Sequence, residues 1–84
     1  MIQINDLNDY KFVVLSLVSN NSILNSTFIP TSLFKIVERI ACERTEVDTK
    51  VTYYAQCRYI SNNSINLWIS NAGLSYVSKL YGVK

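Results

Sequence analysis

The segment from Asp6 to Val18 constrains the fold most, because apolar side chains occupy almost every side of it. Asp6 as an N-cap and Asp9 in the first turn predict that a helix begins here. The apolar positions that would share one broad face are Leu7, Tyr10, Val13, Val14, Leu17 and Val18. Phe12 and Leu15 lie off that face, and a helix that is apolar nearly all round is deeply buried or packs against a second chain. We therefore expect a helix here and keep open a homodimer through Phe12 and Leu15.

The length of the chain limits it to one modest core. It has 84 residues, of which 49% are hydrophobic, and small domains bury a limited share of their surface. A stability of roughly 0.05–0.15 kcal/mol per residue leaves only a few kcal/mol, so dimerisation would add useful stability. The first residues carry acids where a secretion signal carries Lys or Arg, and no apolar run approaches the ~20 residues needed to cross a bilayer. We expect a single domain over residues 1–84, in the cytoplasm and without membrane contact.

Two further helices are predicted, joined by a very short turn. After the short apolar piece Phe28-Ile29, Pro30-Thr31-Ser32 marks the start of a helix that runs to about Glu43. Thr45 and Asp48 resemble a capping box, which predicts a third helix over about residues 46–58. Its buried positions would be Val47, Val51, Tyr54 and Ala55. Cys42 would project from the outer side of the second helix as a surface thiol. Two helices joined so tightly indicate a helix-turn-helix.

A β-hairpin and a last helix complete the predicted order of elements. Tyr59-Ile60 and residues 65–69 flank the polar turn 61–64, and alternating apolar residues after that turn are typical of a half-buried strand. Ser70 would cap a final helix that Gly82 ends. The predicted fold class is α+β, mainly α with a small β-hairpin, in the order α-(β)-α-α-β-β-α.

The segment from Arg58 to Val77 resembles the end of small winged helix-turn-helix regulators of bacteria, archaea and phages. In that family a Gly-Tyr-Ile type ending of the recognition helix leads into the wing, and an Ile-Thr-x-x-Gly-x-x-Tyr-Leu type segment leaves it. The corresponding text here is Arg58-Tyr59-Ile60 and Ile69-Ser70-Asn71-Ala72-Gly73-Leu74-Ser75-Tyr76-Val77. The resemblance implies one winged helix domain, sequence-specific binding of double-stranded DNA and a role in transcription regulation.

The predicted DNA-binding face lies on the recognition helix, residues 46–58. Gln bonds adenine, Thr reads base edges or the thymine methyl, and Tyr donates to phosphate. The outward residues are Thr49, Thr52, Tyr53 and Gln56, with Lys50 at the edge. Contacts to the DNA backbone are expected from Lys35, Arg39, Arg44, Lys50 and Arg58, and the wing tip carries Asn62 and Asn63. Acids at the start of this helix repel phosphate, so a dimer with two half-sites would be expected.

The composition argues against catalysis and against bound cofactors. The chain has no His, and two Cys alone cannot form a four-ligand zinc site. Its two glycines, Gly73 and Gly82, do not form a phosphate-binding loop. We therefore predict no catalytic residue, no metal, no cofactor and no small-molecule ligand.

Two other interpretations stay open beside DNA recognition. The chain could be a protein–protein interaction or dimerisation module that docks a partner through the apolar first helix and a Tyr-rich face. The aromatic residues could also stack the bases of a single strand; they are Tyr53, Tyr54, Tyr59, Trp68 and Tyr76.

Overall fold

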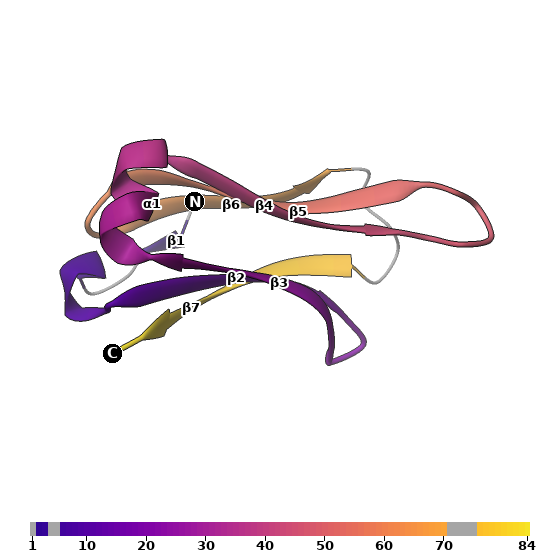
Figure 1. The fold of residues 1–84 in the computed structure, drawn as a ribbon, viewed down its shortest axis with the longest axis horizontal. Coiled ribbons are helices and arrows are strands. Elements are labelled where there is room, and N and C mark those ends of the chain that lie inside the picture. Colours follow the sequence, from indigo (N-terminus) through magenta and orange to yellow (C-terminus); the bar gives the residue numbers. More distant parts are fainter. Residues whose placement is uncertain (1, 4–5, 71–75) are drawn as a thin grey trace.

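The structure is a computed structural model that describes residues 2–3, 6–70 and 76–84 (Figure 1). Strands dominate it, so the prediction of a mainly α fold is wrong. The elements in chain order are β1 (Ile2–Gln3), the 3-10 turn η1 (Leu7–Asp9), β2 (Phe12–Ser19), β3 (Ser22–Pro30), α1 (Thr31–Val37), β4 (Arg39–Thr45), β5 (Thr52–Ser61), β6 (Ser64–Ser70) and β7 (Tyr76–Val83).

The strands form two antiparallel sheets that pack face to face (Figure 1). The β5 sheet has the strand order β1-β6-β5-β4, and the β2 sheet has the order β3-β2-β7. At the two sides of the sandwich, β3 lies beside β4 and β6 lies beside β7. Each strand from β2 to β7 therefore neighbours the next one along the chain, and β7 returns to pair with β2. The chain thus runs up and down around one core.

Side-chain hydrogen bonds connect the two sheets at both sides of the sandwich, where β3 meets β4 and where β6 meets β7. Strand edges carry backbone groups without strand partners, which favour unwanted pairing with other chains. Here, polar side chains on the inner side of the β2 sheet donate to carbonyls at the edges of the β5 sheet. The hydrogen bonds are Asn25 Nδ2 to Glu43 O at 2.6 Å, Thr27 Oγ1 to Ala41 O at 2.8 Å, and Ser78 Oγ to Trp68 O at 2.6 Å.

The apolar segment at the start of the chain is a central strand and not a helix. β2 pairs with β3 on one side and with β7 on the other. The side chains of Val13, Leu15 and Leu17 point into the core, whereas Ser16 and Val18 point outward and are still buried. In a central strand the outward side chains are partly covered by the side chains of the two neighbouring strands, which explains why apolar residues occur on both sides of β2. Only η1 remains of the predicted first helix, with Asp6 accepting a hydrogen bond from the Asn8 amide at 2.9 Å.

The helix-turn-helix is absent from the described residues. The second predicted helix is short, because Glu38 adopts a left-handed conformation with φ of 67° and ends α1. Arg39–Thr45 is then a strand, and the predicted recognition helix is a turn followed by β5. Lys50 also has a positive φ of 60°, which a helix does not allow. The winged helix assignment is therefore corrected to a β-sandwich.

The C-terminal part of the chain agrees with the prediction only in its hairpin. β5 and β6 form a hairpin around the 61–64 turn, although its first strand begins earlier, at Thr52. The start of the last predicted helix, at residues 71–75, lies outside the described residues. Tyr76–Val83, where that helix would continue, is the strand β7.

Two short elements cover one end of the core. Phe34 on α1 is fully buried and meets the ring of Tyr59 edge-on, with centroids 6.0 Å apart. Leu7 on η1 is buried beside them, and its amide donates to the Asn62 carbonyl at 2.7 Å. These residues close the end of the sandwich that carries α1 and the C-terminus (Figure 1).

None of the described helices is long and apolar enough to cross a membrane.

Candidate interaction surface

The outer face of the β2 sheet is unusually apolar for a surface of the molecule. Because neighbouring strands place paired residues on the same side, its side chains lie in rows across β3, β2 and β7. The rows are Pro30, Phe12 and Val83; Phe28, Val14 and Tyr81; Ser26, Ser16 and Lys79; and Ile23, Val18 and Val77. We call these twelve residues the β2 face.

Several large side chains of the β2 face are exposed. Phe28 is 59% exposed and Ile23 is 62% exposed, and smaller but substantial fractions of Val77, Tyr81 and Val83 reach solvent. The rings of Phe12 and Phe28 pack against each other at a tilt, with centroids 4.9 Å apart. The largest apolar patch on a soluble monomer is often functional, and patches larger than a few hundred Å² mark interaction sites.

Apart from the Tyr81 hydroxyl, the polar side-chain groups of the β2 face lie in one row. Ser16 is buried, and its hydroxyl pairs with the hydroxyl of Ser26 at 2.8 Å. Lys79, opposite Ser16 on β7, is the one charged side chain among the described residues of this face. The face therefore carries a positive charge and no carboxylate.

The outer face of the β5 sheet is polar by contrast. Arg39 and Arg58 are paired across β4 and β5, and the Arg39 guanidinium lies 5.6 Å from the centroid of the Trp68 ring. Gln56 is paired with Trp68, so three of the predicted DNA-contacting residues do lie together. They lie on a sheet, however, and no helix presents them to a groove.

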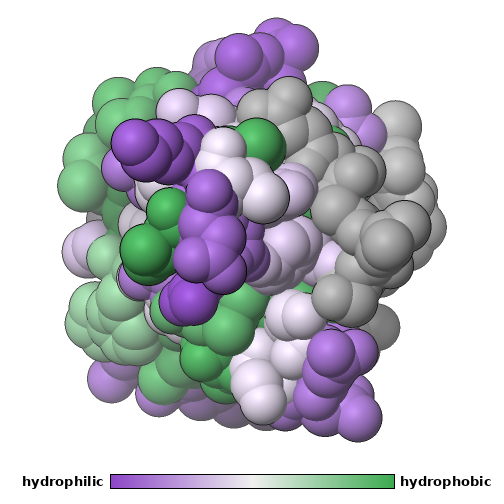
Figure 2. All heavy atoms as spheres, turned by 90° about the vertical axis from the view of Figure 1, so that its right-hand side faces the viewer, coloured by the Kyte–Doolittle hydropathy of each residue, from purple (hydrophilic) through white to green (hydrophobic). Residues whose placement is uncertain are grey.

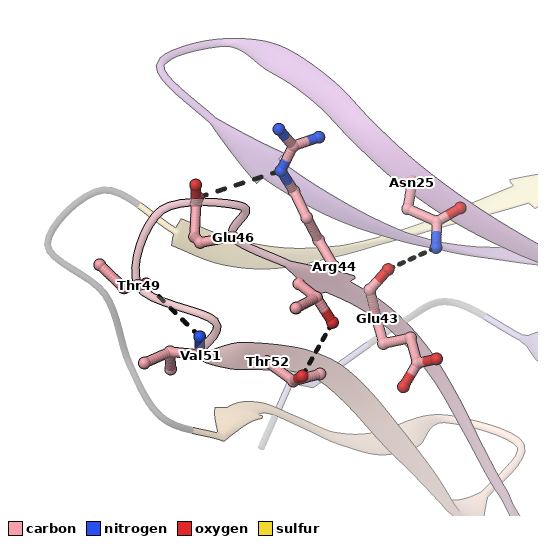
Figure 3. Close-up of polar contacts among 8 residues, drawn as sticks. Asn25, Glu43, Arg44, Glu46, Thr49, Val51 and Thr52 are labelled. Carbon is pink, nitrogen blue, oxygen red and sulfur yellow. Dashed lines mark hydrogen bonds and ion pairs between the residues drawn. The ribbon is translucent and has the colours of Figure 1, made fainter.

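Four of the predicted DNA-contacting residues lie at or beside the β4–β5 turn (Figure 3); they are Arg44, Thr49, Lys50 and Thr52. Arg44 forms an ion pair with Glu46 at 3.9 Å. The hydroxyl of Thr52 is bonded to that of Thr45 at 2.8 Å, and Thr49 Oγ1 accepts from an amide within the turn. The backbone of Lys50 donates to the Glu46 carbonyl at 2.9 Å, which closes the turn on itself. Figure 2 faces this end of the molecule, where hydrophilic and hydrophobic side chains are interspersed.

The remaining predicted residues are scattered over the molecule. Tyr53 faces the other way from Gln56 and packs against Tyr76, with ring centroids 4.4 Å apart. Lys35 lies on α1 and donates to Asn8 Oδ1. Asn62 and Asn63 lie in the β5–β6 turn, where Asn62 Oδ1 accepts from the Tyr59 hydroxyl at 2.9 Å. The structure thus provides no single surface that contains the predicted set.

The two cysteines are core residues and not reactive surface groups. Both thiols are free, and Cys42, which was expected on the surface, is buried in the core together with Cys57. Burial raises the pKa of Cys42, and it raises the pKa of Cys57 to about 12 with a further contribution from the neighbouring Cys42. In the described part of the chain, no three His, Cys, Asp or Glu side chains gather as a metal site.

Comparison with known protein families, curated proteins and solved structures gives no match. The chemistry and geometry of the residues themselves therefore carry the functional argument.

Sequence reasoning missed most of the β2 face, although two signals pointed to it. Asn20-Asn21 lies between two apolar runs, and both residues have positive φ, as the tightest hairpin turns require. The β-branched residues of β2 also favour a strand. Of the two residues proposed for a dimer contact, Phe12 does lie on the β2 face, whereas Leu15 is completely buried in the core.

Proposed function

We propose that this chain is a protein-interaction domain that self-associates through the β2 face, with a second copy of the same chain as its partner. The observation that carries the proposal is the exposure of large apolar side chains on this face, above all Phe28. The proposal keeps the expected homodimer but places its contact on the outer face of a sheet instead of on a helix.

The size of the β2 face supports this proposal. Three strands about 4.8 Å apart, each with a rise of about 3.3 Å per residue, cover roughly 400 Å² in projection, and the accessible surface of protruding side chains is larger. Two such faces would bury on the order of 1,000 Å², which is the lower limit for a specific protein interface. A dimer of modest affinity is therefore expected.

The pattern of side chains supports a second copy as the partner. The two copies of a homodimer are usually related by a twofold axis, so that a patch on one copy contacts the same patch on the other. An axis running along β2 in the interface would place β3 of one copy over β7 of the other. Phe28 would then face Tyr81, and Ile23 would face Val77. Each Lys79 would meet the Ser26 hydroxyl and not the other Lys79, so no like charges would oppose each other.

Sedimentation velocity over protein concentrations from about 1 µM to 1 mM tests this proposal. We expect the wild-type protein to pass from monomer to dimer over this range and Phe28→Lys to remain monomeric. Val47→Lys is the matched control, because Val47 is 83% exposed in the β4–β5 turn, away from the β2 face. A wild-type protein that stays monomeric throughout, or a Val47→Lys variant that dissociates equally, would contradict the proposal.

A further inference from the structure

The outer side of α1 is apolar, although it faces away from the core. Leu33, Ile36 and Val37 are spaced so that they share one side of the helix. That side lies opposite Thr31 and Phe34, which are buried. Ile36 is 78% exposed, and Leu33 and Val37 are nearly half exposed. A helix on a protein surface usually turns polar side chains outward, so an apolar outer side indicates a further contact.

The apolar surface continues from α1 onto β5. The Tyr59 amide donates to the Glu38 carbonyl at 2.6 Å, directly after the last turn of α1. Ile60, the next residue of β5, therefore lies beside that turn, and it is nearly half exposed. The α1 patch, as we call this surface, consists of Leu33, Ile36, Val37 and Ile60. It lies at the end of the sandwich opposite the β4–β5 turn (Figure 1) and shares no residue with the β2 face.

Two arginines of like charge adjoin the α1 patch. Arg39 is paired with Arg58 across β4 and β5, and both side chains are exposed. The hydrogen bond from the Tyr59 amide to the Glu38 carbonyl flanks this pair, so it is a non-hydrogen-bonded pair, in which side chains lie closest. Like charges at such positions destabilise a sheet. Neither arginine forms an ion pair with any described residue. An anion supplied by a partner would relieve the repulsion.

Cations also lie on the other side of α1, next to η1. Lys35 donates to Asn8 of η1, and Lys11 follows η1 closely in the chain. Asp6 and Asp9 lie there too, so the positive charge on the η1 side is partly offset. Basic side chains thus flank the protruding α1 patch on two sides, with the arginine pair as the stronger anion-binding group. A broad anionic surface with an apolar interior fits this arrangement.

We infer that the α1 end of the sandwich binds the surface of an anionic lipid membrane. The α1 patch enters the boundary between headgroups and acyl chains, and Arg39 and Arg58 bond the lipid phosphates, which guanidinium groups match well. Apolar burial and attraction to anionic lipids then act together. This inference revises the expectation that the chain makes no membrane contact. It uses a different surface from the proposed self-association and does not depend on it.

Flotation of the full chain with lipid vesicles tests this inference. We expect binding to mixed phosphatidylserine–phosphatidylcholine vesicles and much weaker binding to phosphatidylcholine alone. Arg39→Gln and Arg58→Gln should each weaken binding about fivefold, the effect of one basic residue near an anionic membrane. Arg44→Gln makes the same change beside the β4–β5 turn, at the opposite end of the sandwich, and should have no effect. Soluble glycerophosphoserine should not release the protein, because it offers no acyl chains to the α1 patch.

Substitutions of exposed apolar residues show which surface enters the membrane. Ile36→Asn should weaken binding about tenfold, because it removes an inserted side chain. Val47→Asn in the β4–β5 turn and Phe28→Asn on the β2 face should leave binding unchanged. A larger loss from Phe28→Asn than from Ile36→Asn would overturn the assignment to the α1 patch.

Three further outcomes would contradict the inference. Absence of binding to the anionic vesicles, or an equal loss in Arg44→Gln, would overturn the membrane site. Release by soluble glycerophosphoserine would show that a free headgroup is sufficient and would overturn insertion. Urea unfolding without vesicles tests the arginine pair itself, since Arg58→Gln removes a repulsion and should not destabilise the fold. A destabilised Arg58→Gln variant would overturn the argument from opposed charges.

Discussion

Asn25 on β3 donates a hydrogen bond from Nδ2 to the backbone carbonyl of Glu43 on β4, across 2.6 Å. This contact joins two strands that belong to different sheets, and Figure 3 shows it between β3 and β4. We expect Asn25→Ala to lower the free energy of unfolding by about 1 kcal/mol, the usual contribution of one hydrogen bond. Urea unfolding measures this change, with Asn66→Ala on the outer face of β6 as the control. Equal free energies of unfolding for the two variants would show that the hydrogen bond from Asn25 to Glu43 does not stabilise the fold.

Gly82 on β7 leaves room for the ring of Tyr10. A Cβ atom at Gly82 would lie only 2.4 Å from Tyr10 Cδ1, so Gly82→Ala should destabilise the fold by about 1–3 kcal/mol. Adding Tyr10→Ala should remove most of that penalty, because the clash partner is gone. A double-mutant cycle from thermal or urea unfolding measures the coupling. Additive effects of the two substitutions would contradict this packing.

Leu15 and Phe12 should behave differently although both were expected at a dimer contact. Leu15 is completely buried, so Leu15→Ala should cost about 2–5 kcal/mol of stability. Phe12 lies half-buried on the β2 face, so Phe12→Ala should cost less stability and weaken self-association. Urea unfolding and sedimentation on the same samples separate the two effects. The assignment of faces fails if Phe12→Ala is the more destabilising substitution.

The buried thiol of Cys57 predicts a loss of stability at alkaline pH. Its pKa is raised from an ordinary value of 9.0 to about 12 in the folded chain. Below pH 9 the thiol is protonated in both states and has no effect. Between pH 9 and 12 the unfolded state binds fewer protons, so the free energy of unfolding falls by up to about 1.4 kcal/mol per pH unit.

Urea unfolding at pH 8 and at about pH 10.5 measures this loss. The wild-type protein should lose about 2 kcal/mol more over that interval than Cys57→Ala, which has no thiol at this position. If both proteins lose stability in parallel, ionisation of Cys57 is not the cause.

The sequence predicted local features of this fold better than its architecture. Asp6 does cap a turn, and residues 61–64 do form the turn between two strands. The apolar character of residues 12–18 was recognised, but a strand between two neighbours and a buried helix produce the same pattern. The β-branched valines in this segment were the available evidence for a strand.

The recognition helix was predicted from a spacing that β5 also satisfies. Val47, Val51, Tyr54 and Ala55 recur at helical intervals, yet only Ala55 is buried. Ala55 and Cys57 are small, so their inward alternation in β5 gives a weak strand signal. The pairing of strands distant in sequence, which creates the β2 face, depends on β7 returning to β2 and is not visible in any local pattern.

Isotope-filtered NOE spectroscopy on an equal mixture of labelled and unlabelled protein tests the proposed self-association most directly. It detects contacts between two copies and assigns them to residues. The proposed arrangement predicts intermolecular contacts between Phe28 of one copy and Tyr81 of the other. Intermolecular contacts from Gln56 and Trp68 on the outer face of the β5 sheet, or none at millimolar protein, would contradict it.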